Sequence, residues 1–139
     1  MTRLVVDANV FASAAVGLPD SPSSRVLAAA ERGEFELVVC DRILAEFQRT
    51  LRGRYFQARV PAEEGTRLDG LLRALAVILP DPTDPPSVVR DPRDDYLVAL
   101  ALAASVEAIV TGDKDLLDHA GLEPPAITPR TACERFRLA

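Results

Sequence analysis

An unbroken apolar run that begins at Tyr96 is the feature that most constrains how this chain can fold. From Tyr96 to Ser105 the sequence has no polar face at helical spacing. A helix that is apolar on every side is normally buried, and Pro92 suits the first turn of such a helix. Asp94 and Asp95 are therefore predicted at its N-terminus, where the helix dipole stabilises each charge by about 0.3–1 kcal/mol. Carboxylates held at the end of a buried element favour a bound cation.

The rest of the chain supplies strands and helices in alternation. The predicted strands cover residues 3–7, 36–40, 107–111 and 125–127. The predicted helices cover residues 9–16, 25–32, 42–51, 61–79 and 130–136, besides the apolar helix and a short one that begins at Leu116. Asp41 is predicted to cap the helix at 42–51, and the proline-rich segment 80–86 is predicted to be a crossing loop. Strands that alternate with helices predict an α/β fold with a mainly parallel sheet covered on both faces.

Length, charge and cysteine usage exclude several classes of protein. We expect the 139 residues to form a single domain, 1–139. The net charge of −5 argues against a protein that coats nucleic acid by bulk charge. No apolar run is long enough to span a membrane, and Asp7 and Asn9 interrupt the N-terminal run, which excludes a signal-peptide core. Cys40 and Cys133 belong to no CxxC pair, so we expect reduced thiols in a cytoplasmic protein without membrane contact.

Acidic residues fall at the edge of the predicted sheet where parallel folds bind their ligands. Asp7 ends the first strand, and Asp113 follows the third. Glu46 lies early in the helix after the second strand, and Asp95 begins the helix that leads into the third. Two carboxylates about 4 Å apart repel by roughly 4 kcal/mol at an effective dielectric of 20. If the four acids converge, either some of them are protonated or a divalent cation lies among them.

The ligand types indicate which cation would fit. Oxygen-only ligands favour Mg²⁺ or Mn²⁺ over Zn²⁺, and the sequence has no His/Cys cluster of the kind that zinc needs. Such ions activate water for attack on a phosphodiester, as in metal-dependent nucleases. Asp91 and Asp115 either support the site or are exposed, and His119 is predicted to be a loop residue. The glycines form no phosphate-binding loop motif.

A basic and aromatic segment begins within the predicted helix 42–51 and continues beyond it. Residues 47–62 contain no acid. The residues of interest in it are Arg49, Arg52, Arg54, Tyr55 and Phe56. Basic residues interleaved with aromatic ones suit phosphate contact and base stacking. Contact with RNA and contact with a protein partner are both compatible with this pattern, and we leave both open.

Four segments of the chain resemble the PIN-domain family. They are residues 5–10, Glu46, residues 91–95 and residues 110–117. The most specific of these read Asp-Pro-Arg-Asp-Asp at 91–95 and Thr-Gly-Asp-Lys-Asp-Leu at 111–116. The nearest branch of the family is the VapC-like ribonuclease toxins of bacterial type II toxin–antitoxin pairs. The resemblance spans nearly the whole chain.

This resemblance implies a fold, an activity and a set of site residues. The fold would be a three-layer α/β/α PIN-like fold, and the activity that of a Mg²⁺-dependent endoribonuclease. The resemblance also implies a homodimer, an RNA substrate and a cognate antitoxin. The catalytic and metal-binding acids would be Asp7, Glu46, Asp95 and Asp113, with Asn9 and Thr111 as polar support and Asp94 and Asp115 beside them. Asp95, rather than Asp94, fits the family's acid before the Leu-x-Ala-x-Ala helix.

Two other functions are compatible with parts of the pattern. One is a catalytically inactive PIN scaffold that only binds RNA or protein. The retention of all four acids argues against it, since a disused site has no physical reason to keep repelling charges together. The other is a phosphoacceptor domain of the receiver or phosphatase type, with Asp7 near Mg²⁺. A haloacid-type phosphatase needs Asp-x-Asp, and here the third residue is Asn9.

Overall fold

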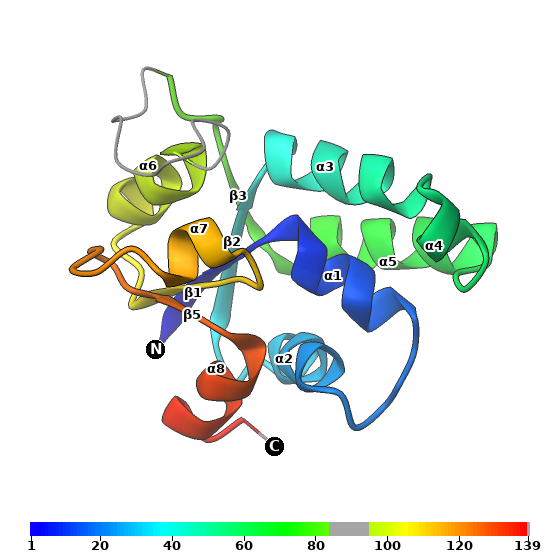
Figure 1. Ribbon diagram of the computed structural model, residues 1–139, viewed down its shortest axis with the longest axis horizontal. Helices are drawn as coiled ribbons and strands as arrows, with labels where there is room; N and C mark the ends of the chain where they lie inside the picture. Colours follow the sequence, from blue (N-terminus) through cyan, green and yellow to red (C-terminus); the bar gives the residue numbers. More distant parts are fainter. Residues whose placement is uncertain (84–94, 139) are drawn as a thin grey trace.

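A five-stranded, all-parallel sheet forms the centre of the protein in the computed structural model, which describes residues 1–83 and 95–138 (Figure 1). The strands are β1 (Arg3–Val6), β2 (Glu36–Cys40), β3 (Val77–Leu79), β4 (Ala108–Val110) and β5 (Ala126–Ile127), in the order β3-β2-β1-β4-β5. The helices are α1 (Ala8–Ala15), α2 (Pro22–Glu31), α3 (Asp41–Leu51), α4 (Arg54–Gln57), α5 (Ala62–Leu75), α6 (Asp95–Ala104), α7 (Lys114–Leu117) and α8 (Pro129–Arg135).

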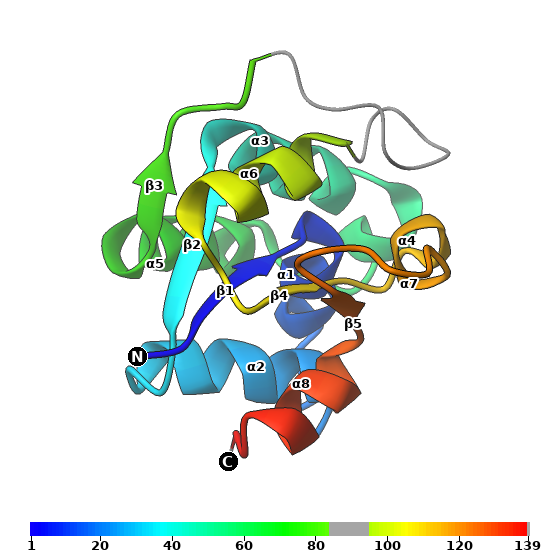
Figure 2. The same cartoon turned by 90° about the vertical axis from the view of Figure 1, so that its left-hand side faces the viewer.

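Helices cover both faces of this sheet. Helix α6 contacts β1, β2 and β4 on one face, while α1, α3 and α5 lie on the other (Figures 1 and 2). Central parallel strands are buried on both sides and are therefore apolar throughout. In β1, Leu4, Val5 and Val6 are all 0 % exposed. The predicted three-layer α/β/α architecture with a parallel sheet is confirmed.

The prediction of one helix over residues 61–79 is wrong in its last part. Helix α5 ends at Leu75, and Ala76 has an extended backbone. The next three residues form β3, in which Val77 pairs with Val38 and Leu79 with Cys40 of β2. The apolar spacing of this segment suits a helix, but β2 has an open edge whose backbone groups need partners. Ile78, expected on the apolar stripe of a helix, is instead 40 % exposed on this edge strand.

The first turn of helix α6 is buried all round, as predicted, but the later part of the helix is not. Tyr96, Leu97 and Val98 point in different directions around the helix, and each is at most 2 % exposed. Leu102 is 54 % exposed, because it lies on the side of α6 that does not pack on the sheet. The described helix begins at Asp95. The predicted contributions of Asp91, Pro92 and Asp94 lie outside the described residues.

Several helix boundaries also differ from the predicted ones. Helix α2 begins at Pro22 instead of Arg25, because the Ser21 side chain caps it by accepting a hydrogen bond from the Ser24 amide at 3.2 Å. Asp41 is the first residue of α3, and Cys40 holds the capping position without a side-chain hydrogen bond. The short helix α4 was not predicted. Both cysteines are free and buried. Within the described ranges, no helix has the length and apolarity needed to cross a bilayer.

Candidate active site

The register of two neighbouring strands brings Asp7 and Thr111 together at the carboxyl edge of the sheet. Val6 in β1 pairs with Val110 in β4, so the residues that follow them are neighbours. The Thr111 hydroxyl donates a hydrogen bond to Oδ2 of Asp7 at 2.8 Å, and the Asp7 amide donates to the Val110 carbonyl at 2.9 Å. Asp7 is 6 % exposed and Thr111 0 %. A carboxylate is thus held inside the protein by the strand pairing itself.

Asp7 also begins helix α1. Its Oδ1 accepts a hydrogen bond from the Ala8 amide at 2.7 Å, as an N-capping side chain does. We predicted that Asn9 would open this helix; it lies instead in the first turn, where its side-chain amide donates to Oδ2 of Asp7 at 3.3 Å. Oδ1 of the Asn9 side chain accepts a hydrogen bond from the Gly112 amide at 3.4 Å. Asn9 therefore links the start of α1 to the loop after β4.

The surroundings of Asp7 make its negative charge costly. Its pKa is raised to about 6: burial is the largest cause, the negative charges of Glu46 and Asp113 add to it, and hydrogen bonds from Thr111 and Ala8 partly oppose it. Glu46 and Asp113 therefore lie close enough to interact with Asp7 electrostatically. Three of the four predicted acids therefore influence one another's charge. A bound cation would favour the ionised form of Asp7.

Asp113 is joined to Asp7 through Thr111. The Asp113 amide donates to the Thr111 hydroxyl oxygen at 3.0 Å, and that hydroxyl donates to Asp7. Asp113 also caps the short helix α7, because its Oδ1 accepts from the Asp115 amide at 2.9 Å. The backbone amide of Asp115 is the donor of this capping hydrogen bond. His119 lies in the loop after α7, as predicted.

Glu46 is held by Tyr96, Arg42 and Arg49, of which only Arg49 was singled out from the sequence, and for a different role. The Tyr96 hydroxyl donates to Oε2 of Glu46 at 2.9 Å. Two arginines of the same helix, Arg42 and Arg49, lie 3.6 Å and 3.9 Å from Oε1. The Arg42 guanidinium also lies 4.0 Å from the centroid of the Tyr96 ring. The i,i+4 spacing of Arg42 and Glu46 was a usable signal, whereas nothing in the sequence indicated that Tyr96 reaches Glu46.

Asp95 lies at the same edge by its position on α6. It is 3 % exposed and is the residue before Tyr96, whose side chain reaches Glu46 on α3. The start of the described helix α6 therefore lies beside the second turn of α3. Asp94, predicted as a supporting residue, is outside the described part of the chain.

The donor set of this edge fits Mg²⁺ as an open site. Among residues 1–83 and 95–138, no three Asp, Glu, His or Cys side chains are grouped closely enough to hold a metal ion by themselves. Mg²⁺ does not need such a cage, since it keeps several waters and is usually bound by one or two carboxylates together with substrate phosphates. Asp7, buried among other acids, offers the carboxylate whose charge a cation would compensate most.

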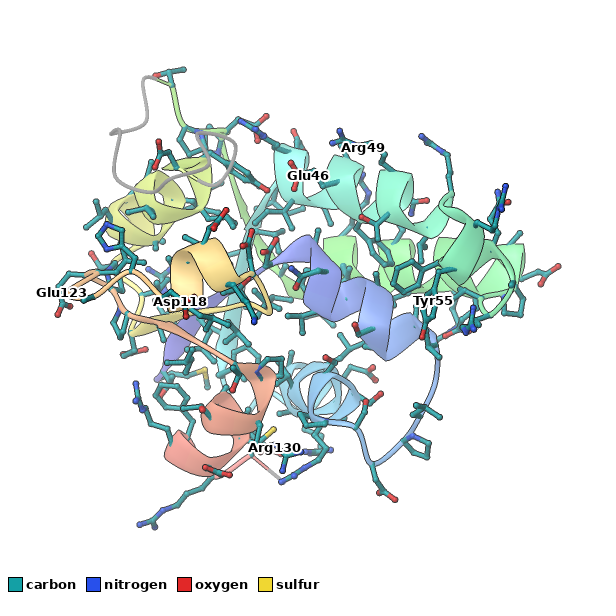
Figure 3. All side chains as sticks on the ribbon, viewed as in Figure 1. Glu46, Arg49, Tyr55, Asp118, Glu123 and Arg130 are labelled. Atoms are coloured by element: carbon teal, nitrogen blue, oxygen red, sulfur yellow. The ribbon has the colours of Figure 1, made fainter. Side chains whose placement is uncertain are left out.

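The basic segment is divided between different surfaces. Arg49 lies near Glu46 on α3, whereas Tyr55 lies at the opposite end of this helical region (Figure 3). Tyr55 is 56 % exposed, and the Arg59 guanidinium lies 3.8 Å from its ring centroid. Phe56 is half-buried and packs against the core, so it offers little surface to a ligand.

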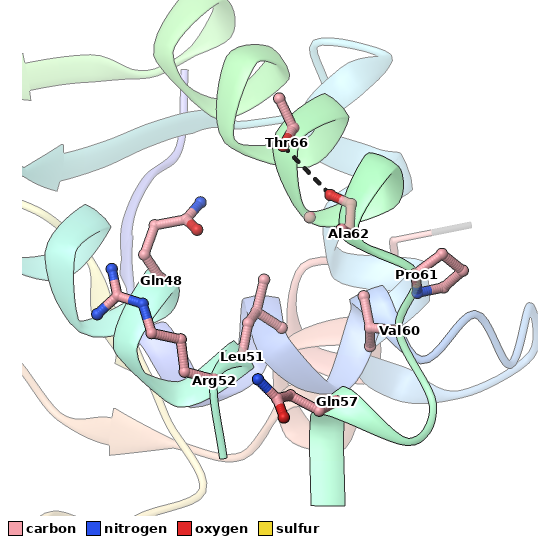
Figure 4. A pocket seen from close by; sticks show the side chains of 9 residues that line it. Gln48, Leu51, Arg52, Gln57, Val60, Pro61, Ala62 and Thr66 are labelled. Atoms are coloured by element: carbon pink, nitrogen blue, oxygen red, sulfur yellow. Dashed lines mark hydrogen bonds between the residues drawn. The ribbon is translucent and has the colours of Figure 1, made fainter. Parts of the chain in front are cut away.

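A groove of about 460 Å³ opens beside this segment, between α3 and α5 (Figure 4). Its lining residues are Gln48, Leu51, Arg52, Gln57, Val60, Pro61, Ala62, Gly65 and Thr66. The lining combines apolar residues such as Leu51 and Val60 with polar ones, and Arg52 is its charged residue. Arg52 therefore belongs to the groove, and Arg54 is exposed on α4.

Known proteins share this architecture. A family model described as the PIN domain matches residues 3–115 of the chain. The crystal structure of PAE2754 from Pyrobaculum aerophilum is similar over 99 % of this chain and 91 % of that one, with a TM-score of 0.66 and 16 % identity. A chain of VapBC2 from Rickettsia felis, solved bound to a DNA fragment from their promoter, is similar over 91 % of this chain and 98 % of that one, with a TM-score of 0.59 and 12 % identity. No curated protein matches the chain.

Proposed function

Because the chain belongs to the PIN domain family, we propose that it is a Mg²⁺-dependent endoribonuclease and the toxin of a toxin–antitoxin pair. The family makes a nuclease the expected class of enzyme. The observation that carries the proposal is the buried Asp7 carboxylate, whose pKa is raised to about 6 by burial together with the charges of Glu46 and Asp113. A carboxylate kept in such surroundings is suited to binding a divalent cation.

The four predicted acids and their two polar neighbours have separate roles in this proposal. Asp7, Glu46, Asp95 and Asp113 would hold Mg²⁺ (or Mn²⁺), directly or through water. Thr111 and Asn9 orient Oδ2 of Asp7 by donating hydrogen bonds to it. When bound, the ion would supply an activated water and charge compensation for a phosphodiester.

The phosphoacceptor function is less well supported by the same geometry. A nucleophilic Asp needs an oxygen that can reach the phosphorus atom. In Asp7, Oδ1 accepts from the Ala8 amide and Oδ2 accepts from the Thr111 hydroxyl, so the carboxylate is held in one orientation. A fixed orientation, with lone pairs left on the oxygens, suits a metal ligand.

We further propose that a cognate antitoxin binds the groove between α3 and α5 and that the protein is a homodimer. One of the structural neighbours is a VapBC2 complex. The groove combines apolar and polar lining residues, which suits an anchoring apolar side chain of a partner. Among the described residues that line it there is no acid, and Arg52 favours a partner segment that carries one.

Cleavage of labelled RNA in Mg²⁺, with and without chelator, tests the nuclease. We expect cleavage that chelator abolishes and that Asp7→Asn or Asp95→Asn reduces by several hundredfold or more, because each removes a charged ligand. Asp20→Asn is the matched control, since Asp20 is an exposed loop acid. RNA binding without cleavage would support the inactive scaffold instead. Cleavage by Asp95→Asn at the wild-type rate would remove Asp95 from the site.

A further inference from the structure

Both oxygens of Glu46 are engaged by side chains. Oε2 accepts from the Tyr96 hydroxyl at 2.9 Å, and Oε1 lies 3.6 Å from Nε of Arg42 and 3.9 Å from Arg49. Arg42 completes a triangle, since its guanidinium also lies over the Tyr96 ring at 4.0 Å. Glutamate on a helix surface normally samples many rotamers. Here two kinds of contact limit the carboxylate to one position.

Tyr96 is suited to act as a lasting hydrogen-bond donor. It is 1 % exposed, so water does not compete for its hydroxyl. The 2.9 Å between its hydroxyl and Oε2 of Glu46 lies within the normal range for an O–H···O hydrogen bond.

The Tyr96–Glu46 hydrogen bond also joins two elements that are far apart in the sequence. The two residues are separated by 50 positions, with Glu46 on α3 and Tyr96 on α6. Asp95, the neighbour of Tyr96, lies at the start of the described α6 and is buried. The bond thus fixes the distance between the helices that carry Asp95 and Glu46.

We propose that Tyr96 is a positioning residue for the acidic site, supported by Arg42. Its hydroxyl fixes the Glu46 carboxylate and holds α3 and α6 in register, so that the acids are ordered before a divalent cation binds. Ordering ligands in advance lowers the entropic cost of binding. The inference rests on the proposed metal-dependent function, and it assigns to Tyr96 no contact with metal or RNA.

Tyr96→Phe tests the proposal because it removes only the hydroxyl and leaves the ring under Arg42. We expect calorimetric titration with Mn²⁺ to show binding weakened by about tenfold, the range found when partners of metal ligands are removed. The Mn²⁺ concentration for half-maximal RNA cleavage should rise by a similar factor, with the rate at saturating Mn²⁺ within about twofold of wild type. Ser21→Ala is the control: it removes a side-chain hydrogen bond from the cap of α2, away from the acids. It should lower the melting temperature without changing Mn²⁺ affinity.

A double-mutant cycle separates positioning from general stability. In a Glu46→Gln background, Tyr96→Phe should cause little further loss of Mn²⁺ affinity, because the group that it positions has lost its charge. An equal loss in both backgrounds would overturn the proposal. Arg42→Lys is a second variant on an exposed side chain: it keeps the charge but loses the planar group over Tyr96, and we expect binding weakened by about threefold. Unchanged affinity in both Tyr96→Phe and Arg42→Lys would also overturn it.

The wild-type protein separates this inference from the proposed function. A wild type that neither binds Mn²⁺ nor cleaves RNA overturns both. A wild type that does both, with Tyr96→Phe indistinguishable from it, overturns only the role of Tyr96.

Discussion

Replacing Asp7 by Asn should stabilise the metal-free protein at neutral pH. The carboxyl of Asp7 has an ordinary pKa of 3.8 when the chain is unfolded and about 6 in the folded protein. Between these values the folded protein holds a proton that the unfolded chain releases, so stability falls as pH rises through this window. Above pH 6 the ionised Asp7 lowers the free energy of unfolding by about 3 kcal/mol, at 1.36 kcal/mol per pKa unit. Asn cannot ionise and escapes this cost.

The substitution also has a smaller unfavourable effect. Asp7 accepts hydrogen bonds on both oxygens, whereas Asn has one acceptor oxygen, and one such bond contributes about 1 kcal/mol. We therefore expect Asp7→Asn to be more stable than wild type by about 2 kcal/mol at pH 7.5 in chelator. For a chain of this length that is a rise of several degrees in melting temperature. Near pH 4 the wild-type carboxyl is mostly protonated, and the advantage should disappear or reverse.

Thermal unfolding of both proteins at pH 4 and 7.5, in chelator and in millimolar Mg²⁺, measures these differences. Mg²⁺ should stabilise wild type by RT ln(1 + [L]/Kd), about 2.7 kcal/mol at a hundredfold excess over Kd. Asp7→Asn should gain much less. If Asp7→Asn melts below wild type at pH 7.5 in chelator, the account of Asp7 as an electrostatically strained carboxylate is wrong.

Three further predictions concern other parts of the chain. Asp113→Asn should melt at or above wild type in chelator and lose most of the Mg²⁺-dependent gain; parallel shifts in the two proteins would mean that Asp113 only caps α7. Replacing Arg52 and Arg54 by Ala should weaken RNA or partner binding and, for RNA, reduce the salt dependence of the affinity; affinities equal to wild type at two salt concentrations would exclude both roles. Ala62→Trp should fill the groove and weaken antitoxin binding at least tenfold while RNA cleavage stays at the wild-type rate, and unimpaired binding in a pull-down with the antitoxin would place the partner elsewhere.

The sequence predicted those parts of the site that depend on strand ends. Asp7 and Asp113 follow buried strands, and parallel strands bring their carboxyl ends to one edge, so their proximity could be predicted from the pattern alone. The choice of Asp95 over Asp94 came from the resemblance to PIN domains, because spacing does not distinguish adjacent acids. The hydrogen bond from Tyr96 to Glu46 could not be predicted, since it depends on how α6 and α3 lie on the sheet.

The missed strand β3 has a similar cause. Residues 77–79 continue the helical spacing of α5, and local propensity does not distinguish a last helical turn from an edge strand. What decides is the open edge of β2, with which Val77 and Leu79 pair. The exposure of Leu102 likewise depends on which side of α6 packs on the sheet. The missed strand and the unexpected exposure of Leu102 both depend on contacts between elements, and the apolar pattern within one element does not predict such contacts.

Two of the acids, Asp7 and Asp113, also cap helices. The backbone amides that they cap should therefore respond when these acids bind a cation. Oδ1 of Asp7 accepts from the Ala8 amide, and Oδ1 of Asp113 accepts from the Asp115 amide. A cation that draws electron density from either carboxylate weakens its capping bond. The Ala8 and Asp115 amide resonances should therefore shift in NMR spectra as the site fills, without any probe attached to the protein. The first turns of α1 and α7 would thus register occupancy of the site before any substrate arrives.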